Sequence, residues 1–209
     1  EQRTFNPWVV GSSPTGPTQI FVSQMLSWCE YTSTVTYPLF TERLSIEPLG
    51  LSDLEAFVNY RQNPEIARYQ SWDDSYSIAQ GRELIESQAG LALPESGQWL
   101  QLAIHDRKSG TLIGDLAIHS LENELNCFEI GFTVANQFQR RGYGKEAAEK
   151  VLEYLVTTAG VKKFIATPDS RNEASIGLLI SLGFEQRQEK TWTEEFKGET
   201  VTVLFFEKF

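Results

Sequence analysis

One stretch constrains the fold of this chain most, because a strand, a glycine loop and a helix follow one another directly. Residues 128–134 are typical of a strand, and residues 146–155 have helical spacing. Between them lies the basic loop Gln139-Arg140-Arg141-Gly142-Tyr143-Gly144-Lys145. A helix start offers unpaired N–H groups and the positive end of the helix dipole, and glycines let an anion approach the main chain. The stretch therefore predicts a phosphate-binding turn.

Length and composition narrow the class of protein. The 209 residues are enough for one domain with a proper core. The net charge of −10 argues against nucleic acid as a partner. It weakly favours a cationic substrate such as an amine, with a solvated acidic surface as the plainer interpretation. Two cysteines and two histidines predict neither a disulfide framework nor a metal site. No apolar run approaches the ~20 residues of a membrane span, so we expect a cytoplasmic protein that does not bind membranes.

The remaining elements predict a mixed α/β fold in one domain, residues 41–209. Short connections between residues 99 and 134 indicate antiparallel hairpins, whereas the crossover from residue 127 to residue 167 indicates a parallel pair. Residues 62–74 are expected to form a polar, aromatic loop. The expected strands are 42–49, 99–104, 112–119, 127–134, 161–167, 184–192 and 199–206. The expected helices are 52–62, 77–88, the one that runs from the glycine loop to residue 159, and 172–182.

The first 40 residues differ from the rest in composition. They are rich in Gly, Ser, Pro and Thr and have no clean periodicity, which is typical of a disordered extension. The only methionine of the chain is Met25, and Val10-Gly11-Ser12-Ser13-Pro14-Thr15 can be back-translated into a string like the T-arm of a transfer RNA gene. One hypothesis is that residues 1–24 are read-through and that the native protein begins at Met25. The other is a genuine flexible tail.

The order of elements and the loop residues resemble the GNAT superfamily of N-acetyltransferases. Gln139-Arg140-Arg141-Gly142-Tyr143-Gly144 fits the family's pyrophosphate loop, Gln/Arg-x-x-Gly-x-Gly/Ala. Three further motifs resemble the ribosomal-protein alanine N-terminal acetyltransferase branch (RimJ/RimL-like): Thr41-Glu42-Arg43-Leu44, Glu129-Ile130-Gly131-Phe132, and Asn172-x-x-Ser175 with Leu182-Gly183-Phe184. The resemblance implies a mostly antiparallel twisted sheet, with one parallel strand pair splayed around acetyl-CoA and helices on both faces. A nucleotide P-loop is excluded because Glu146 follows Lys145.

The resemblance also implies which residues hold acetyl-CoA, the co-substrate. Main-chain amides of the glycine loop would bind the pyrophosphate, the end of the central strand would pair with the pantetheine arm, and Asn172 would bond that arm. The plainer interpretations are a turn into a helix, an ordinary strand and a helix cap. The residues so implied are Phe132, Thr133, Val134, Gln139, Arg140, Arg141, Gly142, Tyr143, Gly144, Lys145 and Asn172.

For catalysis, the resemblance implies Glu129 as general base and Ser175 as a hydrogen-bond donor to the departing thiolate. The alternative for Glu129 is a structural role that orients a neighbouring loop, and His119 and Asp115 are weaker candidates for the base. Leu179 occupies the position where many relatives have a tyrosine, so a tyrosine general acid is not expected. A cysteine nucleophile is not expected either, since Cys127 has no obvious histidine partner.

The function so implied is direct attack of an amine on acetyl-CoA. The favoured acceptor is the N-terminal α-amine of a protein or peptide, and a small polyamine or aminoglycoside is the alternative. A non-catalytic acyl-CoA-binding sensor is the alternative from another class. The first helices and the loop with Tyr69, Trp72, Asp73 and Asp74 would shape the acceptor pocket. Monomer and homodimer both stay open.

Overall fold

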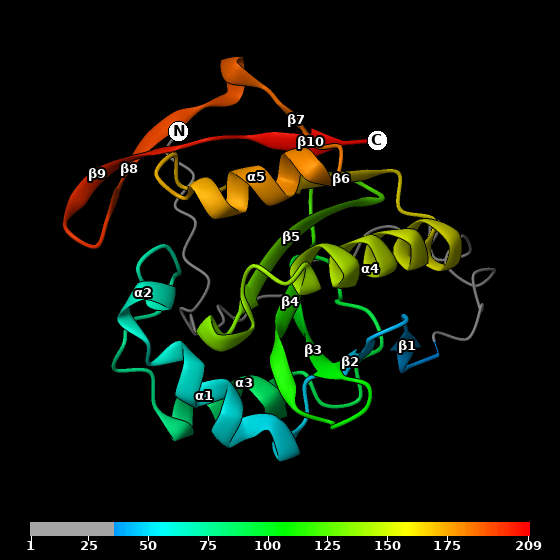
Figure 1. Ribbon diagram of the computed structural model, residues 1–209. Coiled ribbons are helices and arrows are strands. Elements are labelled where there is room, and N and C mark those ends of the chain that lie inside the picture. Colours follow the sequence, from blue (N-terminus) through cyan, green and yellow to red (C-terminus); the bar gives the residue numbers. More distant parts are fainter. Residues whose placement is uncertain (1–35) are drawn as a thin grey trace, which may run out of the picture. The chain divides into compact units, whose positions relative to one another are not determined.

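The computed structural model describes residues 36–209 (Figure 1). The hypothesis of a start at Met25 and the expected extension up to residue 35 lie outside the described residues. Within the described part, none of the helices is long and apolar enough to cross a membrane.

An eight-stranded sheet forms the centre, in the order β1-β2-β3-β4-β5-β6-β10-β7 (Figure 1). All neighbours in it are antiparallel except β5 and β6, which are parallel. This confirms the predicted mixed sheet with one parallel pair. Its strands are β1 Leu39–Phe40, β2 Leu44–Pro48, β3 Trp99–Asp106, β4 Leu112–Ser120, β5 Cys127–Val134, β6 Lys163–Ala166, β7 Glu185–Gln186 and β10 Phe206–Lys208.

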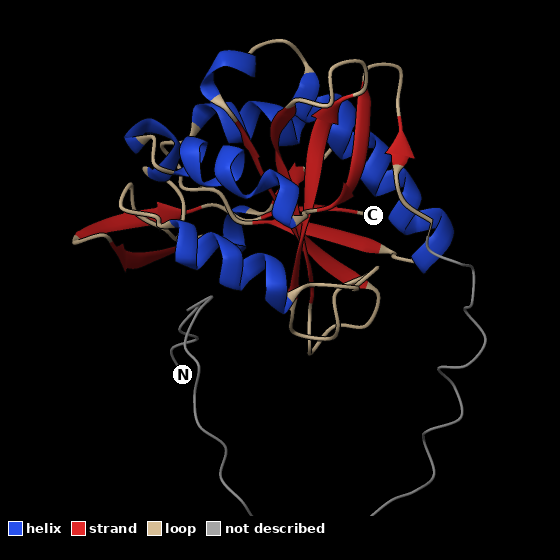
Figure 2. Cartoon of the chain, turned by 90° about the horizontal axis from the view of Figure 1, so that it is seen from below, coloured by secondary structure: helices blue, strands red, loops and turns tan. Residues whose placement is uncertain are grey.

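Helices cover both faces of this sheet, as Figure 2 shows. Alternate strand residues join two separate cores: Leu102 packs in the cluster that contains Val151 of α4, and Ala103 packs in the cluster that contains Phe57 of α1. The two faces are therefore the α4/α5 face and the α1/α3 face. The helices are α1 Leu54–Arg61, α2 Pro64–Ala67, α3 Ile78–Ser87, α4 Tyr143–Ala159 and α5 Glu173–Ser181.

The C-terminal strands differ from the prediction. Residues 184–192 contain the short β7, a 3-10 turn over Gln188–Lys190 and the first residue of β8. The predicted strand 199–206 is split, because its first half, β9 (Glu199–Val203), pairs with β8 (Trp192–Phe196), whereas β10 pairs with β6 and β7. The run Val203-Leu204-Phe205-Phe206 is apolar throughout and does not reveal that the partner strand changes.

The connection over residues 62–74 also differs, because it contains the short helix α2 rather than only loop. Asn63 accepts a hydrogen bond from the N–H of Glu65, and Pro64 occupies the first helical position. The dipeptide that ends α1 therefore also begins α2. This places α2 near the β8–β9 hairpin (Figure 1).

Candidate active site

The parallel strands β5 and β6 separate at one end of their contact. Their pairing ends at Glu129 and Ile165, yet β5 continues through residues 130–134, which pair with β4 alone among the described strands. The carbonyl of Val134 is turned away from β4, where it accepts a hydrogen bond from Gln139 Nε2 (2.9 Å). Because main-chain groups alternate sides along a strand, Phe132 and Val134 direct theirs into the opening.

Thr133 differs from these two neighbours. Its carbonyl lies on the β4 side, so close to Gly114 that a Cβ added there would come within 2.1 Å of it. Of the three strand residues expected to contact the pantetheine arm, Thr133 therefore offers no main-chain group to the opening.

The N-terminus of α4 lies beside the open end of β5. Gly142 caps the helix with φ 79°, a left-handed conformation that favours glycine, and Arg140 precedes it with φ 59°. The main-chain N–H of Glu146 is the first in α4 to donate a helical hydrogen bond, which goes to the carbonyl of Gly142 (3.1 Å). The N–H groups of the preceding turn, residues 143–145, therefore have no acceptor within the helix.

Gly144 allows the helix to approach its neighbours closely. A Cβ at this residue would lie 3.5 Å from Val134 of β5 and 3.4 Å from Leu178 of α5. The glycine loop, the open end of β5 and α5 therefore lie next to one another.

Sequence reasoning missed that this helix start is fixed by residues about a hundred positions earlier. Arg43 Nε donates to Glu146 Oε2 (2.7 Å), and Arg43 Nη1 donates to the carbonyl of Arg141 (3.0 Å). Thr41 donates its hydroxyl proton to Glu146, and the Arg43 guanidinium lies 4.5 Å from the ring centre of Tyr143. Partial burial opposes ionisation of Glu146, but these hydrogen bonds lower its pKa. Arg43 thereby adds a cation next to the loop.

Glu129 lies at the inner end of the opening, where pairing of β5 with β6 stops. Its side chain is buried, with Oε1 accepting from Thr167 Oγ1 (2.7 Å) and Oε2 lying 3.4 Å from His119 Nδ1. Trp99 stacks on the His119 ring at 4.6 Å between centroids. Cross-strand pairing places Trp99, His119 and Glu129 in one row across β3, β4 and β5. Two of the predicted candidates, Glu129 and His119, are thus in contact.

Asp115, the third candidate for the base, belongs to a buried structural cluster. It accepts a hydrogen bond from the hydroxyl of Tyr60 and lies 3.6 Å from Arg61 Nη2. The Arg61 guanidinium in turn lies 4.0 Å from the ring centre of Phe57 and 3.7 Å from that of Trp72. Burial raises the pKa of Asp115, and Arg61 acts against that rise. These contacts give Asp115 the role of holding α1 on the sheet.

Helix α5 carries the remaining predicted residues. Asn172 Oδ1 accepts from the N–H of Ser175 (3.1 Å), which confirms Asn172 as a helix cap. The Ser175 side chain is half-buried and has no hydrogen-bond partner among residues 36–209. Leu179 is fully buried in the core. Nothing polar therefore replaces a tyrosine at that position.

Cys127 is free and buried. Burial raises the pKa of its thiol to about 11. A thiol with such a pKa is protonated near neutral pH and is a poor nucleophile. The prediction that Cys127 is not a nucleophile agrees with this.

The loop expected to shape the acceptor pocket, within residues 62–74, is held by hydrogen bonds and an ion pair from other parts of the chain. Lys197, at the turn of the β8–β9 hairpin, donates to the carbonyls of Ala67 (2.9 Å) and Trp72 (2.6 Å) and pairs with Asp73 (3.1 Å). Tyr69 donates to the carbonyl of Arg171 (3.3 Å). Asp73 therefore pairs with a cation of the chain itself, and the Arg61 guanidinium lies over the Trp72 ring. Asp73 and Asp74 are both exposed.

Coenzyme A fits the residues present. It requires anion-binding N–H groups for the pyrophosphate and main-chain partners for the amide-bearing pantetheine arm. The turn over residues 143–145 offers the first, and Phe132 and Val134 offer the second. The glycines leave no Cβ between the N–H groups and solvent.

Comparison with known proteins shows the family. The chain belongs to the GNAT acetyltransferases, since the family model described as "Acetyltransferase (GNAT) domain" matches residues 43–185. It is therefore an acyltransferase with the GNAT fold. An N-acetyltransferase named p20 from Bacillus licheniformis is 27% identical over 168 residues, which cover 80% of this chain and 93% of that protein. YoaA of Bacillus subtilis, also named an N-acetyltransferase, is 30% identical over 148 residues, 71% of this chain and 82% of YoaA.

Solved structures share the fold at low identity. The spermidine N-acetyltransferase from Vibrio cholerae, solved with CoA and spermine, has a TM-score of 0.69 and 19% identity, covering 80% of this chain and 96% of that one. RimL, an α-N-protein acetyltransferase of ribosomal L7/L12 solved with CoA, has a TM-score of 0.67 and 15% identity, covering 80% and 94%. One neighbour acetylates a polyamine and the other a protein, so the fold does not define the acceptor.

Proposed function

We propose that the protein moves the acetyl group of acetyl-CoA to a primary amine by direct attack, with the N-terminal α-amine of a protein or peptide as the favoured acceptor. One observation carries the proposal. The opening between β5 and β6 has the free N–H groups of α4 at its outer end and the buried carboxylate of Glu129 at its inner end. A donor and a proton acceptor would thus meet in one opening.

The donor end acts mainly through the main chain. Acetyl-CoA, when bound, supplies an acetyl group activated as a thioester. The N–H groups of residues 143–145 bind the pyrophosphate, with the Arg43 cation beside them. Phe132 and Val134 pair with the pantetheine arm as a further strand would. Asn172 Nδ2, which its capping role leaves free among the described residues, donates to the same arm.

The acceptor amine loses its proton to Glu129. Thr167 holds one carboxylate oxygen, so the other, near His119, is the one that accepts the proton. His119 orients this oxygen, and its ring is fixed by Trp99. The hydroxyl of Ser175, unpartnered among the described residues, donates a hydrogen bond to the departing thiolate.

Two other functions stay as alternatives. A polyamine or aminoglycoside acceptor is supported by the net charge of −10 and by the fold shared with the spermidine enzyme. A non-catalytic acyl-CoA sensor would keep the donor end and lose turnover.

Release of free thiol from acetyl-CoA distinguishes these functions. The acceptor panel contains an unblocked peptide, the same peptide with an acetylated N-terminus, spermine and an aminoglycoside. We expect release with the unblocked peptide only, and a strong loss in Glu129→Gln. Release with spermine alone would transfer the proposal to polyamines, and binding of acetyl-CoA without release with any amine would establish the sensor.

A further inference from the structure

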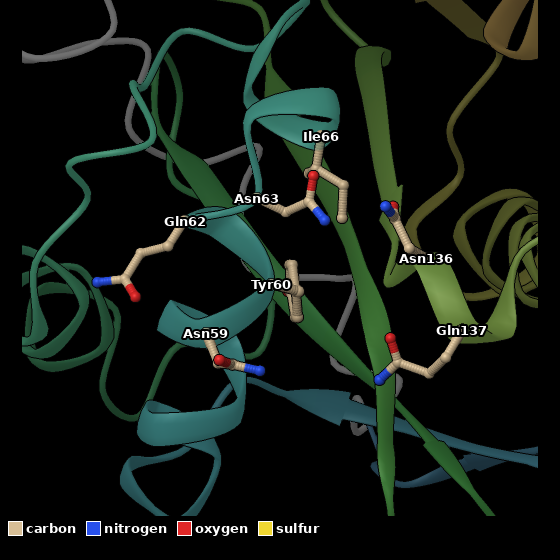
Figure 3. A pocket seen from close by; sticks show the side chains of 7 residues that line it. All are labelled: Asn59, Tyr60, Gln62, Asn63, Ile66, Asn136 and Gln137. Atoms are coloured by element: carbon tan, nitrogen blue, oxygen red, sulfur yellow. The ribbon is translucent and has the colours of Figure 1, made fainter.

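A polar recess lies beside the open end of β5. It has a volume of about 350 Å³ and lies between the end of α1, the start of α2 and the 3-10 turn after β5, Asn136–Phe138 (Figure 3). This is within the size range of small-ligand sites. We call it the amide recess, because carboxamides make up most of its lining, with Tyr60 and Ile66 completing it. The carboxamides are Asn59, Gln62, Asn63, Asn136 and Gln137.

The carboxamides stand on two facing walls. Figure 3 shows Asn59 and Asn63 directed toward Gln137 and Asn136 across the gap, whereas Gln62 points away from it. The side chains of Asn59 and Gln137 have no hydrogen-bond partner among residues 36–209. Each therefore presents a free donor and a free acceptor to the gap.

Contacts behind the lining hold the recess in shape. Asn136 Nδ2 donates to Glu65 Oε2 (3.1 Å), and Asn136 Oδ1 accepts from Gln139 Nε2 (3.1 Å). Gln139 also donates to the carbonyl of Val134. Tyr60, in the floor, is bonded through its hydroxyl to Asp115. The recess is thus built into the same hydrogen-bond network as the open end of β5.

Glu129 and the recess lie along the same face of β5. Thr133 is paired with Asp115, the partner of Tyr60, so Glu129, Gly131 and Thr133 share the face that α1 covers. Above Gly131 there is space, because an added Cβ would contact only Ala117, at 3.9 Å. Asn136 follows Glu129 by seven residues, which span at most about 23 Å at ~3.3 Å per residue.

We propose that the amide recess binds the main chain of a peptide acceptor, roughly five to seven residues from its N-terminus at ~3.3 Å per residue. This deepens, and rests on, the proposed acetyl transfer at Glu129. Each peptide unit carries one donor and one acceptor, which carboxamides complement without regard to side-chain identity. No carboxylate lines the recess itself to pair with the ammonium groups of a polyamine.

The test compares acceptors of different length in matched variants. The acceptors are unblocked serine–glycine peptides of three and of eight residues, and spermine. The variants are Asn59→Ala and Gln137→Ala, both at exposed side chains, with Gln188→Ala as the control, an exposed carboxamide in the turn before β8. Binding of the eight-residue peptide, labelled with fluorescein at its C-terminus, is measured by polarization in the same proteins.

Each recess variant should lower kcat/KM for the longer peptide about fivefold and raise its Kd by the same factor, as loss of one hydrogen bond predicts. The shorter peptide and the control should show no change. The inference is overturned if both peptides are used equally well and the variants change neither, or if spermine is the better acceptor. If no amine is acetylated, the proposed function fails, and the labelled peptide still decides the recess: an unchanged Kd in both variants rejects it, and a raised Kd upholds it.

Discussion

The two ends of the proposed site, a donor end for acetyl-CoA and an acceptor end for the amine, are built from different chemical groups. The donor end consists mainly of main-chain N–H and C=O groups, which a strand, a glycine loop and a helix start place together within residues 132–145. The acceptor end consists of side chains from α1, α2, the turn after β5 and the β8–β9 hairpin. A main-chain site requires only the right elements in the right order, whereas a side-chain site requires particular residues from distant segments.

The two ends are also held in place differently. The helix start at the donor end is fixed by a half-exposed contact, Arg43 with Glu146. The acceptor end rests on the buried pair of Arg61 and Asp115 and on Lys197, which reaches across from the hairpin. Substitutions can therefore separate the two ends, some altering use of acetyl-CoA and others use of the amine.

The largest effect is expected where the ends meet. Glu129→Gln keeps the size of the side chain but removes the proton acceptor, so kcat should fall about 10²–10⁴-fold. The affinity for acetyl-CoA, measured by calorimetric titration, should stay unchanged. The control is Glu149→Gln, on the exposed face of α4. An unaltered kcat in Glu129→Gln would show that Glu129 is not the base.

The next effect concerns the stability of the acceptor end. Arg61→Met leaves Asp115 buried without its cation, which should lower the free energy of unfolding by about 3–5 kcal/mol. Urea denaturation measures this. Arg82→Met, which removes the exposed pair with Glu86, should cost under ~1 kcal/mol. Adding Asp115→Asn to Arg61→Met should restore part of the lost free energy of unfolding, because no charge is then left buried. Equal losses in Arg61→Met and Arg82→Met would contradict the structural role of Arg61.

At the donor end, two glycines of one helix allow a matched test. Gly142 caps the start of α4 with φ 79° and Gly160 caps its end with φ 64°, so alanine at either position should destabilise the protein by about 1–2 kcal/mol. Only Gly142→Ala also adds a Cβ on the side where the pyrophosphate would bind, 3.5 Å from Arg43 Nη2. Its KM for acetyl-CoA should rise about tenfold, a loss of roughly 1.4 kcal/mol in binding. A similar rise in Gly160→Ala would show that strain alone is responsible.

The same contrast explains which parts of the structure could be predicted from the sequence. The strands β3 to β5, the crossover helix α4 and the glycine loop follow from local patterns that the packed molecule keeps. The strand predicted over residues 199–206 was wrong, because its two halves pair with different partners. No local pattern contains that information.

For the candidate site too, local sequence patterns did not predict contacts between residues far apart in the chain. The glycine loop and the helix cap Asn172 follow from residue type and position. The contact of Arg43 with Glu146 joins residues far apart in the sequence, and so do the facing carboxamides Asn59 and Gln137. Thr41-Glu42-Arg43-Leu44 signalled a resemblance to a branch of the family, but not that its arginine lies beside the glycine loop.

The smallest effect lies outside both ends, at His105. Its Nε2 lies 2.8 Å from Asp53, and its Nδ1 lies 3.6 Å from Glu47; the hydrogen bond with Asp53 raises the pKa of His105 despite partial burial. Such a group stabilises the fold below its unfolded pKa of about 6.5. That contribution is lost as the pH rises through the folded value. His105→Gln should therefore cost about 0.5–1 kcal/mol near pH 5.5 and much less at pH 9, by urea denaturation. A cost that grows with pH would contradict the assigned ion pair.

The most direct test of acetyl transfer to an N-terminal α-amine uses one peptide that carries two kinds of amine. An unblocked eight-residue serine–glycine peptide with one internal lysine is incubated with acetyl-CoA and the protein, and fragmentation mass spectrometry locates the acetyl group. We predict one acetyl group on the α-amine and none on the lysine. Acetylation of the lysine side chain, or of spermine in a parallel reaction with the peptide left unmodified, would contradict this function.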